Sequence, residues 1–530
     1  MTPAEALQSL VGTPAERAAW LEELGRVLPA AQRDRIGRLL ELVVWLLGLL
    51  EMKNRSLAKL LRLCFGPRTE SARHGCGRTS EPQPKNKTKA KGHGRRSHRG
   101  YTGAKRVAVA HPTLQAGQIC PDCRKGKLRR RREPAVVLQI QAQPPVGATI
   151  HELEQLRCDL CGKVFTAPTP PEAGTEKYDP SVGVMAGLMR YGSGMPFCRL
   201  ERLQQSLGVP LPASVQWEPA ERVARDLEPV FDHLLYLAAQ SAVIYNDDTP
   251  MRVAALRQEI QKETDPQRTG LFTSGIVSES EQHPIALFFT GRAHAGENLA
   301  QVLDQREPER APPLHMRDGL AHNNPLGHVT VPCGCNVHAR RNFIELQSRF
   351  PEEVRHVVDS FAEVYRVEAQ AKASKLNPQQ RLEAHQASSQ RVMDDLKAWF
   401  SQLIDGKTVE PNSPLGEAIA YTQKRWTELT QFLRIPGAPL DNNVTERILK
   451  MSILHRKNSL SYRTQRGAEV GDLFMTLIQT CRANEVNPFD YLLAVVRNAP
   501  VAKANPDRWM PWNYQANLPP PSMSAAPLTK

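Results

Sequence analysis

Three acidic residues stand in settings where chemistry with a metal ion is feasible. Asp247 follows the apolar run 242–246, and Asp318 follows a second strand-like run, 314–317. Glu446 lies in a polar segment that opens a helix. Hard divalent cations take oxygen ligands from separate rigid elements, and two Mg²⁺ ions held by carboxylates promote in-line phosphoryl transfer. These settings predict a phosphoryl-transfer site for two Mg²⁺ or Mn²⁺ ions.

The elements that must position these carboxylates alternate in type along the chain. Short apolar runs predict strands, and longer periodic segments predict helices. Strands are expected over 242–246, 270–277, 284–290, 314–317 and 329–333, and helices over 293–303 and 337–347. Three strands followed by alternating helix and strand are the order of a ribonuclease-H-like α/β fold. In that fold the first and fourth strands are neighbours, which would bring Asp247 and Asp318 together.

A helical insertion separates the fifth strand from Glu446. The pattern is helical almost throughout 351–433, so the core expected over 241–497 is interrupted there. Asp248 stands directly beside Asp247. Because a strand points successive side chains to opposite faces, only one of these two carboxylates can face the metals.

Two Cys-x-x-Cys pairs predict a structural zinc site. The pairs are separated by 34 residues, and glycine follows the second pair. Such pairs at two hairpin tips resemble a zinc ribbon, in which four thiolates bind Zn²⁺ and leave no position for a substrate. The ribbon is expected over 106–165, with the ligands Cys120, Cys123, Cys158 and Cys161.

The basic residues are concentrated in one segment. The net charge is +14, and 85–132 holds sixteen lysines and arginines against one acid, so the remaining chain is close to neutral. Segment 67–105 is poor in apolar residues and is expected to be a flexible basic linker that contacts nucleic acid. Four ribbon residues are expected to contact backbone phosphates: Arg129, Arg130, Arg131 and Arg132.

Three further segments complete the expected multi-domain α/β organisation. A heptad pattern predicts a helical or coiled-coil segment within 1–66, packed on its own domain or in a dimer. Segment 181–240 is expected to be a helical DNA-binding region, in which 200–226 forms either a helix-turn-helix or an ordinary helical hairpin. The proline-, alanine- and asparagine-rich end, 498–530, is expected to be disordered.

The sequence also predicts where the protein resides. No apolar run is long enough to span a bilayer, and the first residues lack the order of a signal peptide. A cytoplasmic protein with reduced cysteines and no membrane partner is therefore expected.

Nine short motifs occur in the order of one family. Over roughly 40–497 the chain resembles insertion-sequence transposases of the IS-sixty-six type, which are bacterial DDE transposases. The motifs are Phe65-Gly66, Gly100-Tyr101-Thr102-Gly103-Ala104, Cys120-Pro121-Asp122-Cys123, Asp247-Asp248-Thr249-Pro250, Cys335-Asn336-Val337-His338-Ala339-Arg340-Arg341-Asn342-Phe343, Asp441-Asn442-Asn443-Val444-Thr445-Glu446-Arg447, Arg456-Lys457-Asn458, Arg466-Gly467-Ala468-Glu469 and Asn487-Pro488. This chain departs from the family at Ser459 and Ser461, where Trp and Phe are usual.

The resemblance implies a catalytic triad of Asp247, Asp318 and Glu446, with Asp247 rather than Asp248 facing the metals. It implies cleavage and strand transfer of DNA at insertion-sequence ends. The partners would be the terminal repeats, target DNA, further copies of this chain in a synaptic complex, and accessory proteins that such elements often encode. The protein would associate with the nucleoid when bound to DNA. Residues expected to contact DNA are His338, Arg341, Arg447, Arg456 and Lys457.

Alternatives remain at two levels. Cys335 and His338 have the spacing of half a metal site, although no second half is evident. The whole chain also fits a non-catalytic DNA-binding regulator, or a ribonuclease-H-like nuclease without strand transfer. An intact set of three carboxylates argues against the regulator. The basic ribbon and the helical insertion favour a synaptic assembly over a simple nuclease.

Overall fold

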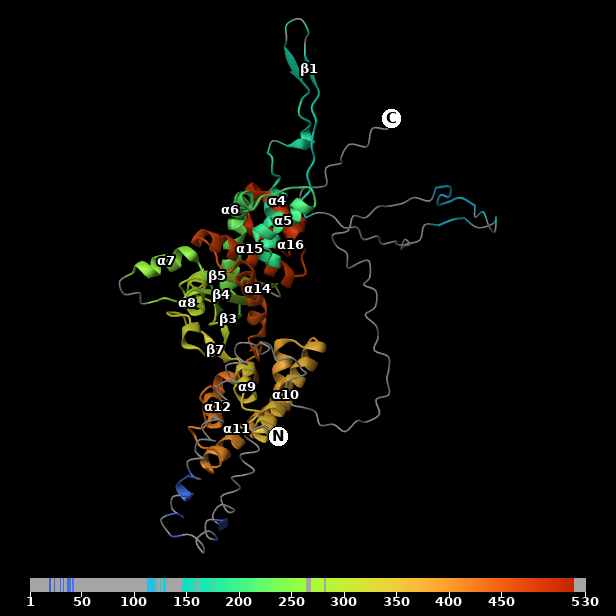
Figure 1. Cartoon of the computed structure of the whole chain (residues 1–530). Coiled ribbons are helices and arrows are strands. Elements are labelled where there is room, and N and C mark those ends of the chain that lie inside the picture. Colours follow the sequence, from blue (N-terminus) through green and yellow to red (C-terminus); the bar gives the residue numbers. More distant parts are fainter. Residues whose placement is uncertain are drawn as a thin grey trace. The chain divides into compact units, whose positions relative to one another are not determined.

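A mixed five-stranded sheet lies at the centre of the described structure (Figure 1). The strands β3, β4 and β5 pair antiparallel, whereas β6 and β7 continue the sheet parallel to β3. The five predicted strands are confirmed, and so is the pairing of the first with the fourth. In spatial order the strands are β5 (His283–Gly291), β4 (Phe272–Ser280), β3 (Val243–Pro250), β6 (Leu314–Arg317) and β7 (Val331–Gly334).

The computed structural model describes most of the chain between 145 and 518. The chain divides into two units, Met1–Lys87 and Thr88–Lys530, and nearly all described residues belong to the second. The gaps after 145 are 158, 160, 162, 175, 264–267 and 281–282. Earlier described residues are 112–119, 121, 124, 127–129 and isolated positions before 42. The predicted linker over 67–105 and nearly all of the predicted segment 1–66 therefore lie outside the described residues.

The sheet separates two hydrophobic cores. Ile244 and Ile276 belong to one core, which includes the helices before the sheet and those after α14. Tyr245 and Val277 belong to the other, which includes the insertion helices. Neighbouring residues of one strand enter opposite cores because strand side chains alternate. The coarse prediction of an α/β fold is confirmed.

The helices before the sheet share the first core. They are α4 (Pro180–Gly187), the π-helical turn η3 (Leu188–Gly192), α5 (Phe197–Ser206) and α6 (Ala213–Ala239), and the short turn η2 (Pro171–Ala173) precedes them outside that core. Helix α6 is much longer than the predicted helix over 213–226 and continues through Pro229. Burial of Leu227, Val230 and Leu234 after the predicted end offsets the missing backbone hydrogen bond at the proline. This packing along the core agrees with the ordinary helical hairpin.

The insertion between β7 and Glu446 is helical, as predicted. Its helices are α10 (Pro351–Ala373), α11 (Pro378–Asp405), α12 (Pro414–Lys424), α13 (Trp426–Leu429) and η5 (Gln431–Leu433). Helices α10 and α11 lie side by side (Figure 1). The two ends of the insertion are joined, because Asn336 donates to the carbonyl of Leu440 from its backbone N–H (3.0 Å) and from Nδ2 (3.1 Å). Asn336 Nδ2 also donates to the carbonyl of Leu429, at 3.0 Å.

The remaining connections around the sheet are short. They are α7 (Ala254–Lys262), α8 (Ala295–Leu303), η4 (Ala321–Asn323), α9 (Asn336–Ile344) and α14 (Asn443–Ser459). The sequence pattern predicts α8 and α9 but not α7. No helix of the described residues is long and apolar enough to cross a membrane.

Helix α15 (Gln465–Ala483) covers the outer edge of β5 with side chains. Three of them, spaced four residues apart, accept hydrogen bonds from alternate backbone N–H groups of the strand. The pairs are Asp472 with Thr290, Thr476 with Phe288 and Thr480 with Ala286, at 2.6, 3.1 and 3.1 Å. Four helical residues rise about 6 Å and two strand residues about 6.6 Å, so the two repeats match. The edge that would otherwise pair with another strand is closed.

The prediction of disorder from 498 onward is wrong as far as 518. After α16 (Pro488–Arg497) the chain forms α17 (Ala499–Ala504), η6 (Pro506–Trp509) and η7 (Tyr514–Asn517). Trp509, Met510 and Tyr514 are buried, and the Tyr491 hydroxyl donates to the Trp509 carbonyl at 2.9 Å. These few large apolar side chains order a segment whose average composition is that of a loop. Residues 519–530 lie outside the described residues.

Candidate active site

Strand β3 points two neighbouring carboxylates to opposite faces of the sheet. Asp247 pairs with Gly275 of β4, where a Cβ atom would meet side chains of α14 at 3.0 Å. Asp248 pairs with Ser274, whose hydroxyl accepts a hydrogen bond from α8. Asp247 therefore faces α14, the helix of Glu446, and Asp248 faces α8. The strand extends to Pro250, so both carboxylates lie within the sheet and not beyond the strand end.

Asp318 begins a tight turn directly after β6. Its Oδ1 accepts hydrogen bonds from the backbone N–H of Leu320 (2.9 Å) and from Nδ2 of Asn323 (2.7 Å). Gly319 has a φ of 88°, and a Cβ atom there would lie 2.6 Å from Nε of Arg425, so the turn requires glycine. Because β6 runs parallel to β3, the turn leaves the sheet near Asp247.

Glu446 lies in the first turn of α14, whose entry is held by Asn442. Asn442 Nδ2 donates to the carbonyl of Asn246 in β3, at 2.9 Å. The Asn442 backbone N–H donates to the buried Cys335 thiol, at 3.3 Å. The start of α14 is therefore bonded both to β3 and to the segment that follows β7.

Asn246 connects the elements that carry the three carboxylates, because its carbonyl binds Asn442 and its buried side chain binds β6 and the turn that follows it. Its Nδ2 donates to the carbonyl of Asn323 and its Oδ1 accepts from Nε2 of His315, both at 2.8 Å. Burial lowers the pKa of His315 to about 3, so the ring is neutral and the network assigns its proton to Nε2. Asn323 in turn donates to Asp318.

Sequence reasoning does not identify this network. The hydrogen bonds of Asn246 join it to residues between 69 and 196 positions away, and no local pattern encodes such pairs. The one available signal is an asparagine near two of the carboxylates, Asn246 before Asp247 and Asn442 before Glu446.

Burial and repulsion raise the pKa of Asp247 to about 7. Burial is the largest cause, and the charge of Asp318 is the next. Asp248 and Glu446 add further repulsion, while a hydrogen bond from the Asp248 backbone N–H (2.8 Å) opposes it. Within the described part of the chain, neither Asp247 nor Asp318 forms an ion pair with a basic side chain. Among the described side chains, no cation therefore compensates the charges of Asp247 and Asp318.

His338 of α9 lies beside the carboxylate on α14. Its Nε2 atom is 3.8 Å from Oε1 of Glu446. Burial, followed by the charge of Arg341, lowers the pKa of His338, so its imidazole is neutral near pH 7. His338 therefore lies beside Glu446, and Arg341 lies within electrostatic reach of His338.

The Cys335 thiol has a structural position. Burial raises the pKa of Cys335 to about 12, and the thiol accepts the hydrogen bond that holds Asn442. Among the described residues, the one group of histidine, cysteine or acidic side chains whose ligand atoms all lie within 4.8 Å of one another is Asp248, His294 and His322. It includes neither Cys335 nor His338, so the structure adds no further ligand to that half-site.

The outer face of α14 is basic. Arg447 and Lys457 are exposed, and Lys450 lies between them on the same helical face. The sequence reasoning missed Lys450, which the helical spacing from Arg447 would have indicated. Arg456 differs, because its guanidinium donates to the carbonyl of Pro250 and to the Thr249 hydroxyl, the latter at 3.4 Å. Arg456 therefore binds α14 to the end of β3.

The backbone segments on either side of each Cys-x-x-Cys pair are paired antiparallel. β1 (Gln155–Arg157) pairs with β2 (Val164–Thr166) around the second, and a bridge between Ile119 and Lys127 flanks the first. Cys161 and Arg129 are exposed. The other predicted ribbon residues lie outside the described residues: Cys120, Cys123, Cys158, Arg130, Arg131 and Arg132.

Comparison with known proteins places the chain among transposases. Residues 178–470 match the family described as "Transposase IS66 family". Uncharacterized protein y4hP of Sinorhizobium fredii (strain NBRC 101917 / NGR234) is 24% identical over 439 residues, which are 77% of this chain and 75% of that protein. Uncharacterized protein y4jD of the same strain is 26% identical over 343 residues, 61% of this chain and 63% of the relative. Since the family match spans more than half of the sequence, the chain belongs to the IS66 transposase family.

Proposed function

We propose that this protein is a DDE transposase that cleaves DNA at insertion-sequence ends and transfers the strands to target DNA. Membership of the family supports a transposase role, and with it a DNA-processing enzyme that binds DNA and uses divalent metal. The proposed catalytic carboxylates are Asp247, Asp318 and Glu446. The proposed core is ribonuclease-H-like, with the observed sheet order supporting it.

One observation carries the proposal. Asp247 and Asp318 come from parallel neighbouring strands, and Glu446 comes from the helix that packs over β3 and β4. The charges of Asp318 and Glu446 both raise the pKa of Asp247, so the three carboxylates lie within electrostatic reach of one another. A protein gains no stability from collecting like charges, which favours a functional origin.

The donor set fits hard divalent cations. Asp247 and Asp318, which form no ion pair among the described residues, and Glu446 supply the carboxylate oxygens that Mg²⁺ and Mn²⁺ take as ligands. Asp247, Asp318 and Glu446 would hold the ions. When bound, the ions would neutralise charge on the attacking and leaving oxygens of a DNA phosphate.

The residues of the chain prepare this site for DNA. The network around Asn246 fixes the carboxylates before substrate arrives, which limits reorganisation during the reaction. Arg447, Lys450 and Lys457 would bind phosphates along the exposed face of α14. Neutral His338 would accept a hydrogen bond near Glu446 without repelling a metal.

The outer segments would supply the remaining binding functions. The structural zinc ribbon over 106–165, the basic linker over 67–105 and the helical region over 181–240 would contact the terminal repeats. Pairing of two DNA ends requires at least two bound ends in one complex, so a homo-oligomer is expected. The hairpins around both Cys-x-x-Cys pairs support the ribbon.

The experiment uses the purified full chain and a duplex that carries the element's own end, with Mg²⁺ or with EDTA. Strand cleavage is measured for wild type, Asp318→Asn and Glu446→Gln. Glu417→Gln is a matched control, because Glu417 also lies in the first turn of a helix, α12. We expect cleavage that requires Mg²⁺, persists in the control, and is lost in the two site variants while DNA binding survives.

Other outcomes discriminate between functions. Cleavage without joining of ends to target DNA would favour a nuclease. Cleavage that survives both site substitutions would refute the proposed catalytic carboxylates. Tight end binding with no cleavage by wild type under any metal would favour a non-catalytic regulator.

A further inference from the structure

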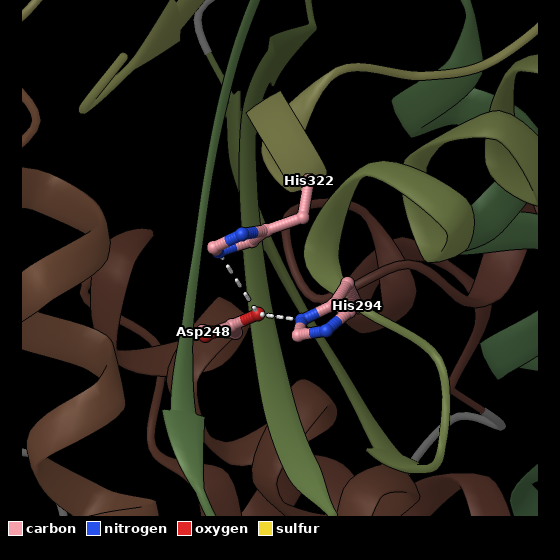
Figure 2. A group of neighbouring side chains, drawn as sticks. All are labelled: Asp248, His294 and His322. Carbon is pink, nitrogen blue, oxygen red and sulfur yellow. Dashed lines mark hydrogen bonds and ion pairs between the residues drawn. The ribbon is translucent and has the colours of Figure 1, made fainter. Parts of the chain in front are cut away.

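A second group of ligand-type side chains lies on the other face of β3. Asp248 of β3, His294 before α8 and His322 of η4 point toward one another (Figure 2). Oδ2 of Asp248 is 2.9 Å from Nδ1 of His294 and 4.0 Å from Nε2 of His322. All three ligand atoms lie within 4.8 Å of one another.

We propose that these three residues form a binding site for a divalent transition-metal ion of the zinc type, separate from the catalytic carboxylates. Two imidazoles and one carboxylate favour Zn²⁺, Co²⁺ or Ni²⁺ over Mg²⁺, because imidazole nitrogen is a poor ligand for hard cations. Ligands of one such ion lie roughly 3–3.5 Å apart, so a shift of about 1 Å by His322 completes the set. The ion takes the place of the hydrogen between Asp248 and Nδ1 of His294, and the neutral His294 ring then carries its proton on Nε2.

Access and rigidity both suit a metal site. The side chains of Asp248, His294 and His322 are 11, 28 and 38% exposed, so an ion can reach them from solvent. His294 is held by a capping box with Glu297, whose Oε2 accepts from the His294 N–H at 2.9 Å. The His294 ring also packs on Phe272, with ring centroids 4.2 Å apart.

The turn that carries His322 is held close to α8. A Cβ atom at Gly296 would lie 2.6 Å from the His322 carbonyl and 2.3 Å from that of Asn324, so glycine permits this approach. The same turn contains Asn323, which donates to Asp318. An ion bound to His322 would therefore restrain the turn that begins at Asp318, although the metal site faces α8 and not α14.

The test uses the full chain, dialysed against EDTA to remove weakly bound ions, and titrated with Co²⁺. We expect visible d–d absorption without new thiolate-to-cobalt charge transfer, since no cysteine takes part. His294→Gln and His322→Gln should each raise the Co²⁺ dissociation constant by about a hundredfold or more, because loss of even an outer partner of a ligand typically costs 10–100-fold. His328→Gln is the matched control, because His328 also pairs with an aspartate, Asp304, at 3.0 Å.

Thermal unfolding provides the second measurement. Co²⁺ should raise the melting temperature of wild type and of His328→Gln but not of His322→Gln, whose exposed side chain can change without loss of the fold. The proposal is overturned if no d–d absorption develops, or if both histidine variants keep it. It is equally overturned if His328→Gln loses the absorption together with them. Carboxylates also bind Co²⁺, so the titration is repeated in Glu446→Gln, which alters the proposed catalytic group and should leave the histidine-dependent absorption in place.

Discussion

The two faces of β3 show how neighbouring carboxylates acquire different properties. On the α14 face, Asp247 meets the charges of Asp318 and Glu446, and its pKa rises to about 7. On the α8 face, Asp248 meets the imidazoles of His294 and His322. Asp247 is repelled by the acidic side chains around it, whereas Asp248, the next residue in the chain, is next to two imidazoles. Because successive side chains of a strand point to opposite faces, the face that each carboxylate occupies determines which groups surround it.

The largest expected effect separates the two faces by activity. Asp247→Asn should lower metal-dependent DNA cleavage by on the order of 10³-fold or more, because metal ligands contribute several kcal/mol to the barrier. Asp248→Asn should lower cleavage by at most about tenfold, through the Asp318 turn. Single-turnover cleavage of an end duplex measures both. Equal losses in the two variants would contradict the assignment of Asp247 alone to the catalytic face.

A second effect concerns stability without metal. The raised pKa means that the fold disfavours ionised Asp247, so this cost is absent near pH 4 and complete above pH 7. Asp247→Asn should therefore stabilise the protein in EDTA at pH 8 by up to ~4 kcal/mol and change little at pH 4. Denaturant unfolding at both pH values measures the difference. A gain in stability of the same size at pH 4 would show that the ionisation of Asp247 does not cause the gain.

A third prediction tests whether the hydrogen bonds of Asn246 hold the carboxylates of the α14 face in position. Asn246→Ala should destabilise the protein by roughly 2–4 kcal/mol, since it leaves Nε2 of His315 and the carbonyl of Asn323 without their buried partner. The apparent Mg²⁺ affinity should fall as well. Asn298→Ala is the matched control, because it removes a buried asparagine that binds Ser274 outside the network. Unchanged Mg²⁺ affinity in Asn246→Ala would separate the network from the carboxylates.

The smallest effect concerns the exposed side of α14. Lys450→Ala should weaken DNA binding several-fold and lower the slope of log affinity against log salt by about 1, as expected for one lost phosphate contact. Lys503→Ala, also exposed but on α17, serves as the control. Binding at several salt concentrations measures both. A similar slope change in both variants would indicate a general charge effect.

Local patterns predict the sheet well and its surroundings less well. Apolar runs predict all five strands, and fold topology predicts the contact of β3 with β6. Segment 499–518 escapes prediction because three buried side chains, and not its average composition, order it. The Asn246 network and the side chains of α15 on β5 escape because they pair residues far apart in sequence. The family resemblance, and not a local pattern, selects Asp247 over Asp248 for the catalytic face. Nothing local predicts that His294 and His322 meet Asp248.

The joined ends of the insertion have an evolutionary consequence. Asn336 and Leu440 are bonded to one another whatever lies between them. The entropy of closing a loop grows slowly, by roughly 0.6 kcal/mol per doubling of its length. Changes of length in the connections between the insertion helices therefore cost little, and Glu446 keeps its place beside β3. The helices themselves are less free to change, because they complete the second core and Arg425 donates to the Gly319 carbonyl next to Asp318.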